Sequence, residues 1–300
     1  MTIRRTAGSE VTDLAVYSRA AQKSAARIIG VYSTSFGMAT GLLGRRVRPG
    51  IQSVYGLVRV ADEIVDGAAA QAGADLTARR ALLDGLEAET AATLCTGYST
   101  NLIVHSFALT AAAAGIGPEL TGPFFASMRR DLDPAPFTAD GVREYIYGSA
   151  EVIGLMCLNV FLHGLPGEPE QRSRLEAGAR RLGSAFQRIN FLRDLRTDWE
   201  GLHRNYFPGI DPEHLTEAQK LVLVADIDDD LAAAGAVIPE LPPDCRAAVG
   251  AAHDLFTALT RRIRATPATQ LLATRVRVPN PVKVRIALKA QTRYMVRRTR

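Results

Sequence analysis

Residues 55–66 of this 300-residue chain read YGLVRVADEIVD, and residues 183–198 read GSAFQRINFLRDLRTD. Successive residues of an α-helix are rotated by about 100°, so Tyr55, Arg59, Asp62 and Asp66 share one helix face. The second stretch aligns a glycine, two amides and two carboxylates, with Arg193 to one side: Gly183, Gln187, Asn190, Asp194 and Asp198. The sequence therefore predicts two helices, each with a stripe of carboxylates and an arginine beside it.

Paired acids one helical turn apart also occur on solvated helices, where lysine or arginine normally relieves their repulsion. The stripe in residues 55–66 instead has mainly apolar neighbours, namely Leu57, Val58, Val60, Ala61, Ile64 and Val65. Buried carboxylates need cations to offset the cost of leaving water. Two such faces suit Mg²⁺, or Mn²⁺ in its place, holding a phosphorylated ligand between them.

Composition and periodicity predict an all-α fold in a single domain over residues 1–300. Hydrophobic residues make up 47% of the chain, and alternating strand patterns are scarce. The sequence has no uninterrupted apolar run of 18 residues and no signal-peptide core after Met1, so we expect a cytoplasmic protein. Helical periodicity covers these ranges: 12–29, 49–66, 74–97, 102–115, 118–130, 138–163, 168–198, 215–235, 244–264 and 281–297.

Several common cofactor and metal motifs are missing from the sequence. It contains no G-x-G-x-x-G after a strand, no G-x-x-x-x-G-K-[ST], no G-x-S-x-G and no H-E-x-x-H. A built-in nicotinamide or ATP site therefore has no support. Cys95, Cys157 and Cys245 form no C-x-x-C pair, so we expect neither a disulfide framework nor a zinc site, and interpret the three as core residues.

The net charge of +5 is concentrated at the C-terminal end. Residues from about 275 to 300 form a basic, partly amphipathic tail in which lysines and arginines alternate with valines, an isoleucine, a leucine and a methionine. Three interpretations remain open: a membrane surface as partner, a solvated terminal helix, or arginines that face a phosphate site. Membrane binding would make the protein peripheral on the inner face of the cell membrane. Nucleic acid is disfavoured because few aromatic residues interleave with the charges.

Four blocks of sequence, in order, resemble the motifs of the squalene and phytoene synthase family. They are 33–36 (STSF), 55–66, 145–154 (YIYGSAEVIG) and 183–194, the last continuing through Asp198 to 206–208 (YFP). The resemblance covers about residues 18–290. It implies an isoprenoid synthase fold, in which helices surround a central apolar cavity.

The resemblance also implies an activity, namely Mg²⁺-dependent head-to-head condensation of two prenyl diphosphates. The chain is most similar to bacterial phytoene synthases, which implies a carotenoid-pathway prenyltransferase that joins two geranylgeranyl diphosphates, through prephytoene diphosphate, into phytoene without NADPH. One alternative is a C30 synthase that uses farnesyl diphosphate to give presqualene diphosphate, squalene or dehydrosqualene. Others are a head-to-tail prenyltransferase and a non-catalytic prenyl-binding or assembly protein.

The family motifs assign expected roles to individual residues. The metal ligands would be Asp62, Asp66, Asn190, Asp194 and Asp198. The diphosphate would contact Ser33, Ser35, Arg59, Arg193 and Tyr206. Besides the released diphosphate, the candidate groups for proton removal are Tyr55, Tyr145 and Gln187. The lining of the apolar cavity would include Phe36, Tyr145, Val152, Ile153, Leu155, Met156 and Phe186.

Three positions depart from the family pattern. Glu63 stands where many members have aspartate, but it does not share the face of Asp62 and Asp66. Glu151 replaces a small glycine of the central helix, which puts the shape or polarity of the acceptor pocket in question. Phe256 replaces an expected tyrosine and so lacks a hydroxyl.

Overall fold

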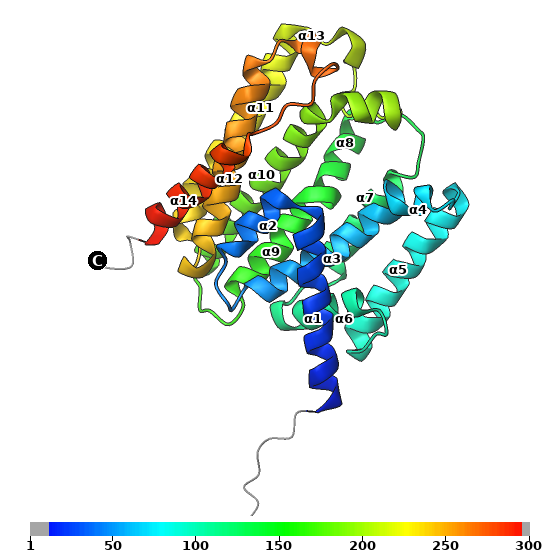
Figure 1. The fold of residues 1–300 in the computed structure, drawn as a ribbon, viewed down its shortest axis with the longest axis vertical. Coiled ribbons are helices and arrows are strands. Elements are labelled where there is room, and N and C mark those ends of the chain that lie inside the picture. Colours follow the sequence, from blue (N-terminus) through cyan, green and yellow to red (C-terminus); the bar gives the residue numbers. More distant parts are fainter. Residues whose placement is uncertain (1–11, 296–300) are drawn as a thin grey trace, which may run out of the picture.

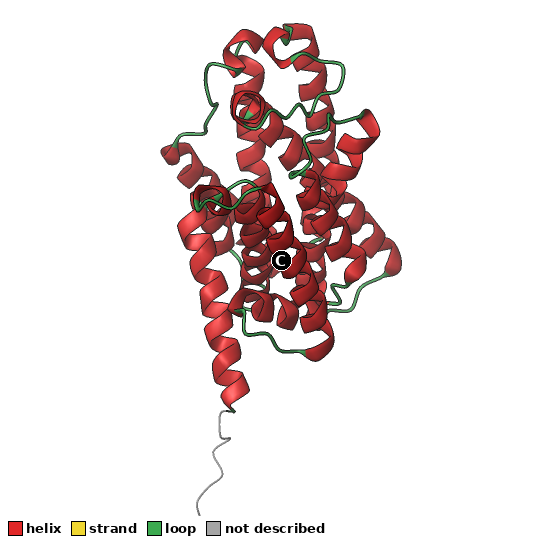
Figure 2. Ribbon diagram, turned by 90° about the vertical axis from the view of Figure 1, so that its right-hand side faces the viewer, coloured by secondary structure: helices red, strands yellow, loops and turns green. Residues whose placement is uncertain are grey.

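Helices make up all the regular structure of the computed structural model, which describes residues 12–295 (Figures 1 and 2). No strand occurs among these residues, which confirms the all-α prediction. The α-helices are α1 (Asp13–Tyr32), α2 (Thr34–Gly41), α3 (Arg48–Val65), α4 (Ala68–Gln71), α5 (Leu76–Thr96), α6 (Leu102–Ala114), α7 (Pro118–Arg130), α8 (Ala139–Ile146), α9 (Val152–Leu162), α10 (Pro169–Arg193), α11 (Glu217–Val237), α12 (Pro243–Ala265), α13 (Ala268–Leu271) and α14 (Asn280–Met295).

Four shorter turns complete the helical structure. Two are π-helical, η1 (Tyr147–Glu151) and η2 (Thr197–Gly201), and two are 3₁₀ turns, η3 (Pro212–His214) and η4 (Ile238–Glu240). The side chain of Ser35 and the tail residues 296–300 lie outside what the structure describes. The assignment of residues 1–300 to a single domain stays a prediction.

The start of α2 and the end of α10 differ from the expected helix pattern. Ser33 leaves the helical region and its hydroxyl accepts a hydrogen bond from the Phe36 amide at 3.0 Å, so a separate helix begins there. The predicted helix 168–198 ends at Arg193, and a π-helical turn follows it. The Asp198 amide still donates to the Asp194 carbonyl at 3.0 Å, so these two aspartates remain one turn apart.

The central helical stretch runs through α8, η1 and α9 and packs against α7, α10 and α3. Glycines allow close approach to α10: a Cβ at Gly154 or Gly183 would lie 2.6 Å from the carbonyl oxygen of Ala179 or Ala150. Residues Ala139–Leu162 are long and apolar enough to cross a membrane, but half of the apolar window is buried inside the protein. Its hydropathy therefore fits a core helix.

Two clusters of buried apolar side chains flank the middle of the protein. One gathers residues of α3, α5, α6, α7 and α9, including Leu57, Phe107 and Phe124. The other gathers residues of α10, α11 and α12, including Ile189 and Ile263. The helices α3, α9, α10 and α12 that meet between the clusters enclose the candidate site.

Candidate active site

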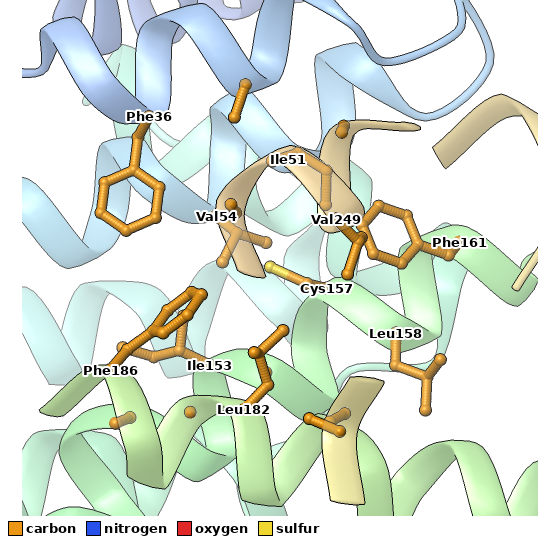
Figure 3. Close-up of a pocket in the computed structure, with 18 of the residues that line it drawn as sticks. Phe36, Ile51, Val54, Ile153, Cys157, Leu158, Phe161, Leu182, Phe186 and Val249 are labelled. Carbon is orange, nitrogen blue, oxygen red and sulfur yellow. The ribbon is translucent and has the colours of Figure 1, made fainter. Parts of the chain in front are cut away.

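An apolar chamber of about 380 Å³ lies between α2, α3, α9, α10 and α12. Figure 3 shows Phe36 and Phe186 at one end, Phe161 at the other, and Ile153, Cys157 and Leu182 along the walls. Nearly all the exposed lining is hydrocarbon, so the chamber suits an apolar chain rather than a polar ligand. Of the residues expected to line a cavity, Phe36, Ile153 and Phe186 do so.

Val152, Leu155 and Met156 do not line the apolar chamber, so that part of the prediction is wrong. Val152 and Met156 are 0% and 1% exposed and belong to the buried cluster around α3 and α7. Val152 and Met156, one turn apart, lie on the face of α9 that packs against α3 and α7, whereas Ile153 and Cys157 lie on the face toward the chamber. The chamber is lined by Ile153, as expected, and by Cys157, which the sequence interpretation had placed in the core.

A second, polar chamber of about 950 Å³ adjoins the first. The two share six lining residues: Phe36, Tyr55, Val58, Ser149, Gln187 and Asn190. The charged lining of the polar chamber is mainly basic and consists of Arg59, Asp62, Asp131, Arg193, Arg275, Arg277 and Lys283. A ligand with a hydrocarbon tail and an anionic head can therefore place each part in a matching chamber.

The α3 wall is the side of the site formed by Arg59, Asp62 and Asp66. Arg59 and Asp62 line the polar chamber, whereas Asp66, the C-cap of α3, does not. Arg59 Nη1 lies 2.8 Å from Asp62 Oδ2, and Arg59 also pairs with Glu63. Asp66 is bound by Arg204, whose Nη2 and Nη1 atoms lie 2.6 and 2.8 Å from its two carboxylate oxygens. Arg204 therefore binds Asp66 bidentately, the strongest geometry for such a pair.

The α10 wall is the side of the site formed by the end of α10 and by η2. Asn190 and Arg193 line the polar chamber there, whereas Asp194, the C-cap of α10, and Asp198, in η2, do not. Two arginines hold Asp194: Arg193 Nε is 3.0 Å and Arg275 Nε is 2.7 Å from its Oδ1 atom. Burial alone would raise the pKa of Asp194, but the hydrogen bonds and charges of these arginines outweigh it and hold that pKa below its usual value. An arginine of the basic tail thus faces the site, as one of the three interpretations of that tail proposed.

Asp198 has the opposite electrostatic environment. Burial, followed by repulsion from Asp194 and Asp66, raises the pKa of Asp198 to about 7. Arg204 links the two walls, because its guanidinium binds Asp66 and its backbone amide donates a hydrogen bond to the Asp198 carbonyl at 2.7 Å. The geometry brings together the two acidic stripes that are about 130 residues apart in sequence.

The donor groups fit a magnesium ion that shares its coordination with a phosphate. Among residues 12–295, no three carboxylate, histidine or cysteine side chains converge as a closed metal cage. Mg²⁺ usually takes one or two carboxylates and completes its shell with phosphate oxygens and water. Asn190 Oδ1 is buried without a hydrogen-bond partner where the chambers meet, as expected for an oxygen that awaits a ligand.

Asp131 and Arg204 form the part of the site that the sequence motifs did not reveal. The buried Asp131 accepts a hydrogen bond from the Tyr145 hydroxyl at 3.1 Å, and its Oδ1 atom lies 3.3 Å from Arg204 Nη1. Arg204 lies two residues before Tyr206 of the fourth motif, so its position in the sequence could have indicated a role at the site. Asp131 carries no comparable signal, because it follows α7 in a stretch without a motif.

Tyr145 lines the polar chamber, whereas Tyr206 lines neither chamber. Tyr206 stacks on Phe191 with ring centroids 3.9 Å apart and on Tyr145 at 5.3 Å. Burial, and then the charge of Asp131, keeps the pKa of Tyr145 well above its ordinary value, so its phenol stays protonated. The structure thus places Tyr206 behind Tyr145, away from the space available to a ligand.

The remaining expected residues lie at or near the junction of the chambers. Tyr55 and Gln187 line both chambers, and Ser33 lines the polar one while capping α2. Glu151 lines neither chamber; its carboxylate binds Arg180 Nε at 2.7 Å. Glu151 therefore leaves the polarity of the chambers unchanged. Phe256 stacks on Phe186 with ring centroids 3.8 Å apart.

The three cysteines occupy three different environments. Cys245 is buried, Cys95 is exposed, and Cys157 lines the apolar chamber, so the interpretation of all three as core residues is wrong for Cys95. Burial raises the pKa of the Cys157 thiol to about 12, which keeps it protonated and weakly nucleophilic at neutral pH.

Comparison with known proteins gives matches of two kinds. The family model described as squalene/phytoene synthase matches residues 29–281. A 15-cis-phytoene synthase from Paracoccus sp. (strain N81106 / MBIC 01143) is 28% identical over 251 residues, 77% of this chain and 78% of that protein.

Solved structures share the fold. A dehydrosqualene synthase in complex with a ligand superposes with a TM-score of 0.77 at 20% identity, covering 93% of this chain and 98% of its own. Squalene synthase HpnC from Alicyclobacillus acidocaldarius superposes with a TM-score of 0.64 at 20% identity, covering 83% and 95%. These likenesses confirm the isoprenoid synthase fold.

Proposed function

This chain belongs to the squalene/phytoene synthase family of head-to-head prenyltransferases, and from that premise we propose that it joins two geranylgeranyl diphosphates into phytoene. The observation that carries the proposal is the pair of adjoining chambers, one apolar and one lined by basic and acidic side chains. The 28% identity to a 15-cis-phytoene synthase supports the C40 product over the C30 alternatives.

The polar chamber would hold the diphosphates. Arg59, Arg193 and Arg275 line it and supply charge-assisted hydrogen bonds to phosphate oxygens. Asp62 and Asp66 on one wall, and Asn190, Asp194 and Asp198 on the other, would hold Mg²⁺. When bound, Mg²⁺ would supply positive charge that stabilises diphosphate as a leaving group. Ser33, at the N-terminus of α2, adds a hydroxyl at the same chamber.

The first half-reaction would break the C1–O bond of the donor, and the bonding electron pair would leave with the diphosphate. The C2–C3 double bond of the acceptor then forms the new carbon–carbon bond to C1, and loss of one proton closes a cyclopropane. Phe36 lines both chambers, and Phe186 lies next to it in the apolar chamber with ring centroids 6.3 Å apart, so the two rings would keep water from the cationic carbon. Their ring faces also favour positive charge nearby.

The second half-reaction would release the remaining diphosphate, rearrange the cyclopropane and lose a second proton. Two diphosphates and two protons leave in total, so the electrons balance without a reductant and no NADPH is needed. The proton acceptor would be the released diphosphate or a group at the junction. Gln187 and Tyr55 line both chambers there. Tyr145 lines the polar chamber only, and its phenol stays protonated, which makes it a hydrogen-bond donor and a poor proton acceptor.

The test is to incubate the purified protein with Mg²⁺ and either geranylgeranyl or farnesyl diphosphate, with and without NADPH, and identify hydrocarbons by mass. A C40 triene formed without NADPH is the expected product. A C30 product would overturn the substrate assignment in favour of a squalene-type or dehydrosqualene-type synthase. Neither hydrocarbon nor released diphosphate would favour a non-catalytic prenyl-binding protein.

A further inference from the structure

The C-terminal part of the chain has an unusual charge distribution. From Leu255 to Arg300 the sequence contains twelve lysines and arginines and no aspartate or glutamate. Some of these cations serve the site, because Arg275, Arg277 and Lys283 line the polar chamber. Others lie on α14 and line neither chamber, so the site does not account for them.

The outer face of α14 combines exposed apolar and basic side chains. Val284 and Leu288, one turn apart, are 48% and 59% exposed, and the exposed Arg285 and Lys289 each follow one of them in sequence. The inner face packs on α12 and buries Ala290. Asp254 of α12 lies near Lys289 and Arg293 and offsets part of their charge. Among residues 12–295, Arg285 and Lys289 form no ion pair.

This helix lies beside both chambers. Asn280 and Lys283, in its first turn, line the polar chamber. Lys283, Ile286 and Ala287 also line a small apolar crevice together with Phe36 and Ala39, and both of those residues line the apolar chamber as well. The path from the α14 surface to the apolar chamber therefore passes over hydrocarbon side chains.

We propose that the outer face of α14 docks on an anionic lipid bilayer and holds the α14 side of the two chambers at the membrane surface. Val284 and Leu288 would enter the headgroup region, while Arg285 and Lys289 would bind anionic headgroups. The role of this docking rests on the proposed function, because a diphosphate with a long prenyl tail partitions into bilayers and a C40 hydrocarbon must be released into one. The docking surface itself is defined by α14 alone.

The experiment is flotation of the full-length protein with phosphatidylcholine vesicles, with and without phosphatidylglycerol, in the absence of substrate. We expect binding to the anionic vesicles only. Arg285→Gln/Lys289→Gln should weaken it on the order of 25-fold, about fivefold for each charge removed. Val284→Ser/Leu288→Ser should weaken it by about tenfold through lost apolar burial.

Two matched double variants control for general charge and general hydrophobicity. Lys23→Gln/Arg27→Gln removes two exposed cations one turn apart on α1. Leu221→Ser/Val222→Ser removes two apolar side chains, 43% and 63% exposed, from α11. Both should bind anionic vesicles as the natural chain does. Equal losses in the controls and the α14 variants would overturn the proposal.

Two further arms separate the alternatives. Inorganic diphosphate should leave vesicle binding unchanged; displacement by it would mean that these cations bind the ligand's phosphates rather than lipid headgroups. Turnover in detergent micelles reports on the proposed reaction alone, and Arg285→Gln/Lys289→Gln should retain it. A protein that makes the C40 product in micelles but binds no vesicles would refute the docking and leave the reaction intact.

Discussion

The α3 wall and the α10 wall share one sequence plan but differ in their electrostatics. Each has two aspartates one helical turn apart and an arginine close by. On α3, Asp62 is paired within its own helix, and Asp66 is held by Arg204 from the opposite side. At the end of α10, Asp194 is held by two arginines, whereas Asp198, in η2, is repelled by two other carboxylates. Equal spacing along a helix therefore does not give equal charge states.

The largest expected effect would show whether both walls are needed for the reaction. Asp62→Asn and Asp194→Asn should each lower kcat by about 10²–10³-fold, because each removes charge from the proposed metal and diphosphate site. Diphosphate release measures turnover, and circular dichroism should show unchanged helix content. Asp140→Asn, at an exposed ion pair with Arg143, is the control. Normal turnover in either variant would remove that wall from the metal site.

The second effect concerns the arginine that crosses between the walls. Arg204→Ala should lower the free energy of unfolding by about 3 kcal/mol, since it leaves the buried Asp131 without its cation. Arg59→Ala should cost less than about 1 kcal/mol, because Arg59 is 31% exposed and its pairs are partly solvated. Urea denaturation measures both. If the two variants unfold at the same urea concentration, Arg204 does not anchor the site.

The third effect is a change in Tm that has opposite signs for the two aspartates of the α10 wall. Asp194→Asn should lower the Tm by about 1–3 °C, because Arg193 and Arg275 lose their partner. Asp198→Asn should raise the Tm by a similar amount at pH 8 without Mg²⁺, because it relieves repulsion by Asp194 and Asp66.

The pH dependence of stability follows from the direction in which the pKa of Asp198 is shifted. Its pKa is about 7 in the folded protein and about 3.9 in the unfolded chain, so the folded state binds the extra proton between these values. Its contribution to stability is therefore lost as pH rises from about 4 to about 7. In thermal melts with EDTA, the Tm of Asp198→Asn should fall less between pH 5 and pH 8 than the Tm of the natural chain. Equal decreases of Tm in the two proteins would contradict this environment for Asp198.

The smallest effect concerns the third acid of α3, which has no counterpart on α10. Glu63 pairs with Arg59, and its Oε2 atom accepts a hydrogen bond from the Ala68 amide at 2.9 Å. Glu63→Gln should therefore cost less than about 1 kcal/mol of stability and change kcat by no more than about threefold. Steady-state kinetics and melting curves test this. A loss as large as that of Asp62→Asn would make Glu63 a metal ligand.

Most helices were predictable because the spacing of apolar residues along a helix is a local property. The two acidic stripes were predictable for the same reason. Val152 and Met156 were misplaced because an apolar residue of a central helix can face either a cavity or a packed core, and only the packing of α9 on α3 and α7 decides which. Arg204 and Asp131 were missed because their roles come from packing between α3, the end of α7 and the segment after α10, which no single motif spans.

The sequence by itself determined the all-α class, the family and the two carboxylate faces, because residue identity and helical period fix which side chains share a face. Only the tertiary structure decided which cation meets each carboxylate, where the apolar and polar chambers join, and that Arg275 belongs to the site while Arg285 faces outward. The physical reason is that charge pairing and burial depend on neighbours brought together from distant segments. A one-dimensional pattern does not contain those neighbours.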